Sequence, residues 1–194
     1  MRPAALLLAG ALALSVAACA DDPNSLSSQA KAGDRKGYVS GDGSVEKISA
    51  DERQVPVRLT GKTLDGQDWS LAEEKGSVVV INVWGSWCGP CVAEAPGLQK
   101  AWDGLSKAGK PVQFMGIDFR EAPERGAAFL KANNITYPSL TDESGVLILA
   151  LQGKAPTVPT TLVLDKTGRI AARVNGEVST ATLTGLVDDV LAEA

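Results

Sequence analysis

Two predominantly apolar runs stand out from the more mixed sequence around them: residues 77–83, which are largely β-branched, and residues 111–119. Runs of this length without polar alternation are typical of strands buried on both faces. Residues 91–107 lie between them and favour a helix, in which Pro96 is expected to introduce a kink. The centre of the domain is therefore predicted to be two helix-linked strands.

Beyond residue 119 the pattern predicts two helices, a hairpin and a final helix. The first helix begins at Pro123, which suits a first helical turn, and its apolar face contains Phe129 and Leu130. The final helix is amphipathic, with one face formed by Leu183, Leu186, Val187, Val190 and Leu191. The predicted ranges are 123–133 and 143–151 for the two helices, 160–164 and 170–175 for the hairpin strands, and 181–194 for the final helix.

A further hairpin is predicted before the first long run. Residues 55–59 alternate between apolar and polar, and residues 63–69 contain Asp65-Gly66, a dipeptide typical of tight turns. The whole order is β-β, then β-α-β-α, then β-β-α. Helix-linked strands followed by an antiparallel hairpin predict the α/β class, with a mixed β-sheet and flanking helices on both faces.

The N-terminus has the pattern of a targeting signal. Arg2 precedes an apolar stretch from Leu6 to Val16, which is too short to span a bilayer comfortably. Small residues then lead to Cys19, as in the bacterial lipobox, where the cysteine is lipidated; a plain secretory signal with an incidental cysteine is the alternative. We therefore expect a lipoprotein signal peptide at 1–18, a flexible tether at 19–46 that is poor in large apolar residues, and a folded domain at 47–194.

Composition narrows the chemistry. The 194 residues are 44% hydrophobic and 22% charged, with a net charge of −4 and no basic stripe, which argues against nucleic-acid binding. The chain contains no histidine, so sites that need a histidine ligand or a histidine base are excluded. Any catalysis must use cysteine, carboxylate, hydroxyl or backbone groups.

Cys88 and Cys91 form a Cys-Gly-Pro-Cys motif directly after the first apolar run, where a strand ends and a helix begins. A helix N-terminus stabilises a thiolate, so Cys88 is expected to be the attacking thiol, and Cys91 to resolve the mixed disulfide. Gly89 and Pro90 shape the turn. Half of a zinc site or a chance pair are the alternatives, but a zinc site needs two further ligands that the domain lacks.

The motif Trp87-Cys88-Gly89-Pro90-Cys91, followed by Val158-Pro159-Thr160, resembles that of thioredoxin-fold proteins. The lipobox, the N-terminal hairpin, an extra segment at 121–151 and the string from Cys91 to Pro96 make residues 47–194 similar to membrane-tethered TlpA/ResA-like thiol–disulfide oxidoreductases. This resemblance implies a thioredoxin-like sheet with a central inserted segment. It also implies disulfide exchange with other proteins, and it requires no cofactor beyond the cysteine pair.

The resemblance implies roles for residues around the dithiol. Pro159 would follow a cis peptide bond, and the Val158 backbone would pair with substrate; Pro156 is the weaker candidate, and an ordinary trans proline the alternative. Glu94 would tune the thiols, unless it is a solvated surface residue. The substrate-facing residues are expected to be Trp87, Gly89, Pro90, Val158 and Pro159, although Trp84 and Trp87 are equally compatible with plain core packing.

Asn82 differs from the buried aspartate that thioredoxin has six residues before its first cysteine. Because an amide cannot accept the proton, Glu94 is the obvious acceptor.

The expected function is that of a lipid-anchored oxidoreductase on the extracytoplasmic face of the cell membrane. Its partners would be protein thiols and disulfides and a thiol-type membrane electron donor or acceptor. A reductase role, for example on apocytochrome c, fits the resemblance best, and a disulfide-forming oxidase is the close alternative. A Cu(I) chaperone is a third possibility, although its relatives use Cys-x-x-x-Cys and a histidine. A peroxiredoxin would need a motif that is absent.

Overall fold

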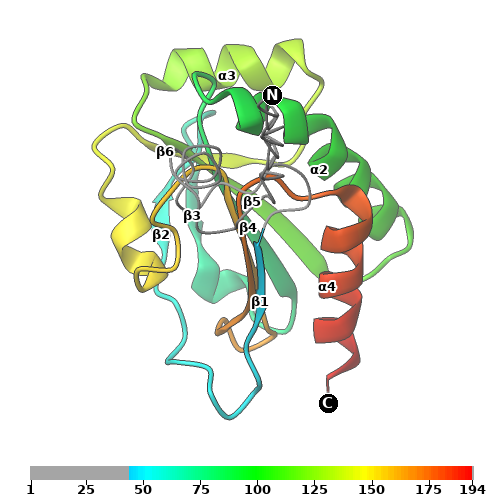
Figure 1. The fold of residues 1–194 in the computed structure, drawn as a ribbon. Helices are drawn as coiled ribbons and strands as arrows, with labels where there is room; N and C mark the ends of the chain where they lie inside the picture. Colours follow the sequence, from blue (N-terminus) through cyan, green and yellow to red (C-terminus); the bar gives the residue numbers. More distant parts are fainter. Residues whose placement is uncertain (1–43, 194) are drawn as a thin grey trace, which may run out of the picture. The chain divides into compact units, whose positions relative to one another are not determined.

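The computed structural model describes residues 44–193, which form a central sheet covered by helices (Figure 1). Six strands lie in the order β1-β8-β7-β4-β5-β6. Their bounds are β1 Ser44–Lys47, β4 Val78–Trp84, β5 Val112–Phe119, β6 Ser139–Asp142, β7 Thr160–Leu164 and β8 Ile170–Asn175.

The sheet is mixed, as predicted. β4 pairs in parallel with β5 and antiparallel with β7, while β5 pairs in parallel with β6. All seven residues of β4 are buried because both faces of this strand are covered. The adjacent strand β5 reaches Phe119, so the ends of these two strands bring Trp84 and Asp118 side by side.

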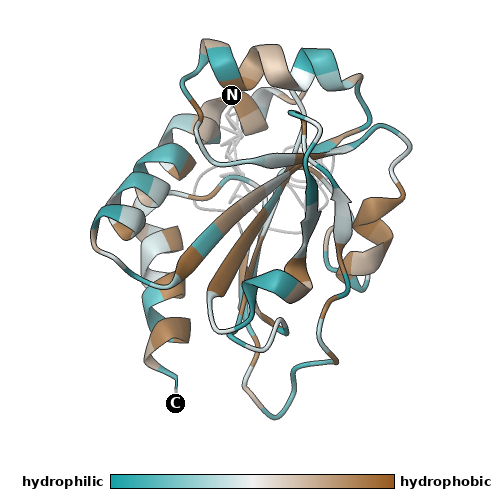
Figure 2. Ribbon diagram, turned by 180° about the vertical axis from the view of Figure 1, so that it is seen from behind, coloured by the Kyte–Doolittle hydropathy of each residue, from teal (hydrophilic) through white to brown (hydrophobic). Residues whose placement is uncertain are grey.

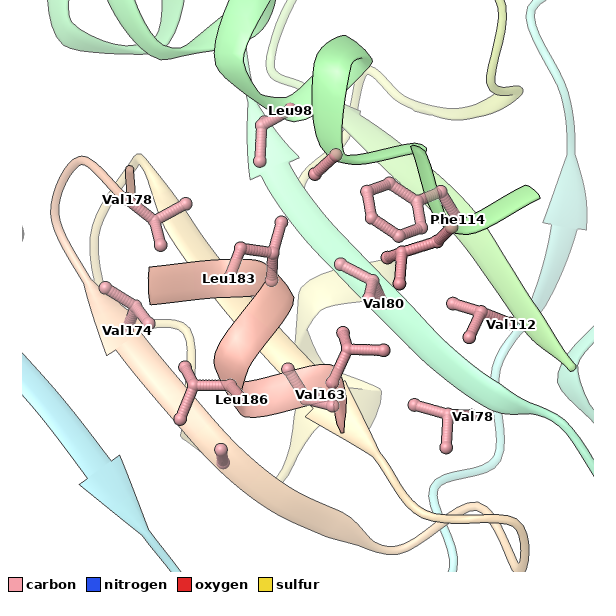
Figure 3. Packing of buried hydrophobic residues seen from close by; sticks show 14 of the residues in the cluster. Val78, Val80, Leu98, Val112, Phe114, Val163, Val174, Val178, Leu183 and Leu186 are labelled. Carbon is pink, nitrogen blue, oxygen red and sulfur yellow. The ribbon is translucent and has the colours of Figure 1, made fainter. Parts of the chain in front are cut away.

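Within residues 44–193, three α-helices and two 3-10 helices accompany the sheet: α2 Gly89–Lys107, α3 Pro123–Ala132, α4 Thr180–Ala192, η1 Leu71–Glu74 and η2 Leu147–Leu151. Figure 3 shows the apolar core on one face of the sheet, where Leu183 and Leu186 of α4 pack over strand residues such as Val80 and Val163. A second core, on the other face, includes Val79, Ile81 and Leu151. Figure 2 shows brown apolar segments along the strands and teal hydrophilic segments on the helices.

The N-terminal hairpin exists, but its first strand is not where the alternation at 55–59 predicts it. The paired strands are β2 Thr60–Lys62 and β3 Asp68–Ser70, joined through the Asp65-Gly66 turn. Residues 55–59 form no strand: Val57 and Leu59 are buried singly in the second core, and the Val57 N–H donates to the Gly168 carbonyl. Here alternate burial arises from loop packing rather than from strand pairing.

Two edge strands depart from the sequence prediction. β1 begins at Ser44, three residues before the predicted start of the domain, and pairs with β8. β6, the other edge strand, was not predicted. The helix expected at 143–151 is only the 3-10 turn η2, whose first N–H groups are held by Asp142. Short edge strands need few apolar residues, so their patterns are weak.

Candidate active site

The two cysteines of the motif form a disulfide at the start of α2. Cys88 is the N-cap residue, Cys91 lies in the first turn, and their Cα atoms are 5.2 Å apart. The Cys91 N–H donates to Cys88 Sγ at 3.2 Å, and Pro90 lies in the first turn, where its missing N–H leaves no bond unmade. Cys88 is 6% exposed and Cys91 is 2% exposed. The order of exposure agrees with Cys88 as the attacking thiol, whose role stays a prediction.

Trp84 ends β4 and Trp87 directly precedes Cys88, and the two side chains differ in burial. Trp84 is buried with Cys88 and Cys91, and its indole N–H donates to Ser139 Oγ at 3.2 Å. Trp87 is 51% exposed, and its indole N–H donates to the Phe119 carbonyl at 3.1 Å. Trp84 is therefore a core residue, whereas Trp87 remains available at the rim.

The Val158–Pro159 peptide bond is cis, as predicted. Among the peptide bonds of residues 44–193 it is the one in this form, so Pro156 is not an alternative. Pro159 is buried, and the half-buried Val158 packs against the cluster that contains Cys88 and Cys91. The bend before β7 thus lies beside the disulfide.

Glu94 is buried rather than solvated, with only 5% of its surface exposed. Asn82 Nδ2 donates to one carboxyl oxygen at 2.9 Å, and the Val178 N–H donates to the other at 3.0 Å. Burial raises the pKa of Glu94 to about 8, although both hydrogen bonds act to lower it; Glu177 raises it slightly further. Glu94 follows Cys91 by three residues, so both lie on one face of α2.

A second buried carboxyl site was missed in the sequence. Asp118, at the end of β5, is fully buried, and burial followed by the neighbouring Glu121 raises its pKa to about 9. Glu121 accepts hydrogen bonds from Ser86 N and Ser86 Oγ, both at 2.5 Å. Although burial acts in the opposite direction, hydrogen bonds from Asp118 and Ser86 hold the pKa of Glu121 below its usual value. The available signal was an acidic residue inside an apolar run, followed three residues later by another.

Between Ser44 and Glu193, no three acidic, cysteine or histidine side chains are grouped closely enough to hold a metal ion. Within the same range no helix is long and apolar enough to cross a membrane. Cys19 lies outside the described residues.

Comparison with known proteins places these features in a family. A model of the AhpC/TSA family matches residues 52–173. HelX of Rhodobacter capsulatus, a thiol:disulfide interchange protein, is 32% identical over 60% of this chain and 62% of its own length, which is less than two thirds of that protein. Sporulation thiol-disulfide oxidoreductase A of Bacillus subtilis is also 32% identical, over 62% of this chain and 73% of its own length.

A solved structure also resembles this chain and supports the same family. The structure of a secreted thiol-disulfide isomerase from Corynebacterium glutamicum has a TM-score of 0.72 and 31% identity, covering 80% of this chain and 97% of that one. The chain therefore belongs to the AhpC/TSA family and, within it, to the thioredoxin-like thiol–disulfide oxidoreductases.

Proposed function

We propose that this protein reduces disulfides of other proteins outside the cytoplasm and attacks them through Cys88. The observation that carries the proposal is the buried Glu94, one helical turn after Cys91 in α2. The buried Glu94 carboxyl group gives a nearby thiolate no stabilising charge, and once ionised it disfavours that thiolate, so the reduced dithiol is a stronger electron donor. A thiol–disulfide protein that acts as a strong oxidant has the opposite property: its reduced form is stabilised, so it gives up electrons less readily.

The reaction runs in two exchanges. The Cys88 thiolate attacks one sulfur of the substrate disulfide, and the other substrate sulfur leaves as a thiolate. Cys91 then loses its proton, and its thiolate attacks Cys88 Sγ, which breaks the mixed disulfide, releases the second substrate sulfur as a thiolate and leaves the Cys88–Cys91 disulfide. The two substrate thiolates take up protons from water to give the dithiol. Because its pKa of about 8 lies near neutral pH, the ionised Glu94 is suited to take the proton from Cys91.

The substrate would bind along the rim formed by the exposed Trp87 and the Val158–Pro159 bend. An extended peptide segment fits this geometry, since a bend before a strand leaves backbone groups available for pairing. Resemblance to TlpA/ResA-like proteins supports apocytochrome c, whose haem-attachment motif Cys-x-x-Cys-His carries two cysteines, as the substrate.

Membrane attachment is proposed through a lipid on Cys19. The apolar stretch before it and the small residues Ala17 and Ala18 support this site. A lipid-anchored enzyme would receive its electrons from a thiol-type donor at the same membrane.

The test uses a peptide that contains Cys-x-x-Cys-His. The reduced protein should convert the disulfide form of the peptide to the dithiol, and a double variant with Cys88→Ser and Cys91→Ser should not. Faster oxidation of the reduced peptide by the disulfide form of the protein would instead support the oxidase role.

A further inference from the structure

Outside the dithiol, the buried carboxyl groups of Asp118 and Glu121 and the half-buried Ser86 form a group that has no part in the exchange described above. Ser86 lies in the loop between β4 and α2, two residues before Cys88. Its N–H and its hydroxyl both donate to Glu121, each at 2.5 Å. A single carboxylate thus accepts from both hydrogen-bond donors of one loop residue.

Asp118 is the second carboxyl group at this position, next to Glu121. Its side chain is fully buried beneath α3, where a methyl group on Gly126 would lie 2.0 Å from its Oδ2. No N–H or O–H group of the described residues donates to either of its oxygens. Its hydrogen-bond partner is the carboxyl group of Glu121. Two carboxyl groups share a hydrogen bond only when one of them keeps a proton. The pair therefore holds one proton and one negative charge.

The loop held by Glu121 carries the exposed Trp87 and leads into Cys88. After Ser86, the Trp87 indole donates to the Phe119 carbonyl of β5 at 3.1 Å. The Cys88 N–H then donates back to Gly85 at 3.1 Å. Three donors of Ser86 and Trp87 therefore form hydrogen bonds with Phe119, at the end of β5, and with Glu121, shortly after it.

We propose that Glu121 is a positioning residue for Cys88 and Trp87, and that the proton shared with Asp118 keeps it in place. While the pair is protonated, the loop is held for attack on a partner disulfide. When the shared proton is lost, two adjacent buried carboxylates repel one another and the loop is released. This role rests on the disulfide exchange proposed above, because it concerns the same nucleophile.

Few other charges face the pair. Arg125 of α3 favours the charged form of Glu121, whereas Glu124 of the same helix is exposed. From β6, the residue paired with Asp118 is Thr141, and the next carboxylate, Asp142, is bound to the N–H groups that open η2. Arg120 lies over the Phe119 ring. From β4, the paired residue is Trp84, which does not titrate.

The test measures how fast Cys88 forms a mixed disulfide with the Cys-x-x-Cys-His disulfide peptide, in full-length protein carrying Cys91→Ser. This rate does not depend on the equilibrium direction of electron transfer, so its outcome is separate from the test of the reductase role. The rate is followed from pH 7 to pH 10, and Cys88 ionisation is measured separately by alkylation with iodoacetamide.

Asp118→Asn replaces the shared proton with an amide N–H that cannot be lost. For a pair that ionises near pH 9, the protonated fraction in the parent falls about tenfold between pH 8 and pH 10. After correction for Cys88 ionisation, the ratio of the Asp118→Asn rate to the parent rate should therefore rise about tenfold over this interval. A ratio that stays constant would overturn the proposed role of the proton.

Glu121→Gln should slow the reaction at every pH, including pH 7, because the Ser86 donors use one carboxylate oxygen each and an amide replaces one of those oxygens with an NH₂ group. Ser86→Ala removes only the hydroxyl bond, leaves the acid pair intact and should give a smaller loss, so it tests the anchor if the first variant folds poorly. Glu124→Gln, on the exposed side of α3, is the matched control and should react as the parent does. Parent-like rates in the Ser86→Ala and Glu121→Gln proteins would overturn the positioning role.

Discussion

Glu94→Gln should remove a large pH dependence from the stability of the disulfide form. The pKa of Glu94 rises from its ordinary 4.5 to about 8 on folding, mainly through burial. Between these values the folded protein binds a proton that the unfolded chain has lost, so stability falls as pH rises. Each pH unit in this interval costs about 1.4 kcal/mol, which gives an upper bound of about 4 kcal/mol between pH 5 and pH 9. That is a large part of the about 5–15 kcal/mol that stabilises a domain.

The glutamine can be accommodated without a buried unpaired group. Its oxygen would accept from the Val178 N–H, while the Asn82 amide turns over to accept from the new NH₂ group and from the Thr161 hydroxyl, its present hydrogen-bond partner. The loss of charge, rather than a change of shape, therefore decides the result.

Guanidinium unfolding of the disulfide form at pH 5, 7 and 9 measures the effect. The parent should lose more stability than Glu94→Gln as pH rises, and the exposed-site control Glu124→Gln should follow the parent. Parallel stability profiles for the parent and Glu94→Gln would refute the buried, protonated Glu94. In the reduced protein, the same variant should lower the thiol pKa values, as the alkylation rate against pH would show.

Other expected outcomes concern the nucleophile, the anchor and the packing beneath the dithiol. Cys91→Ser should accumulate mixed disulfides with partner proteins and Cys88→Ser far fewer; equal trapping would reverse or erase the assignment. Cys19→Ala should leave the membrane fraction, and unchanged fractionation would rule out the lipid anchor. Gly116→Ala should destabilise the fold by about 1–3 kcal/mol in guanidinium unfolding, because its methyl group would lie 2.1 Å from Ser139 Oγ. Gly104→Ala, on the open face of α2, should not.

The central elements could be predicted because their sequence pattern is local. β4 is buried on both faces, so its residues from Val78 to Trp84 form an almost continuous apolar run that is visible in the sequence. β6 was missed because an edge strand of four residues has Leu140 as its one large apolar side chain. At 55–59 the alternation was real, but loop packing against the second core produced it.

The site divides in the same way. The Cys88–Cys91 spacing and the strand-to-helix position could be recognised in the sequence because one turn of chain contains both. The Asp118–Glu121 pair depends on contacts that no local pattern shows. Glu121 meets Ser86 from 35 positions away, and α3 covers Asp118 only because Gly126 has no side chain. Buried polar pairs of this kind depend on tertiary structure.

The equilibrium reduction potential of the Cys88/Cys91 couple tests the proposed direction of electron transfer most directly. The full-length protein would be equilibrated with glutathione buffers, and the fraction of dithiol measured by alkylation. We expect a value near the thioredoxin end of the range, about −270 mV, because the buried Glu94 does not stabilise the thiolate. A value near that of a strong oxidant, about −120 mV, would contradict it.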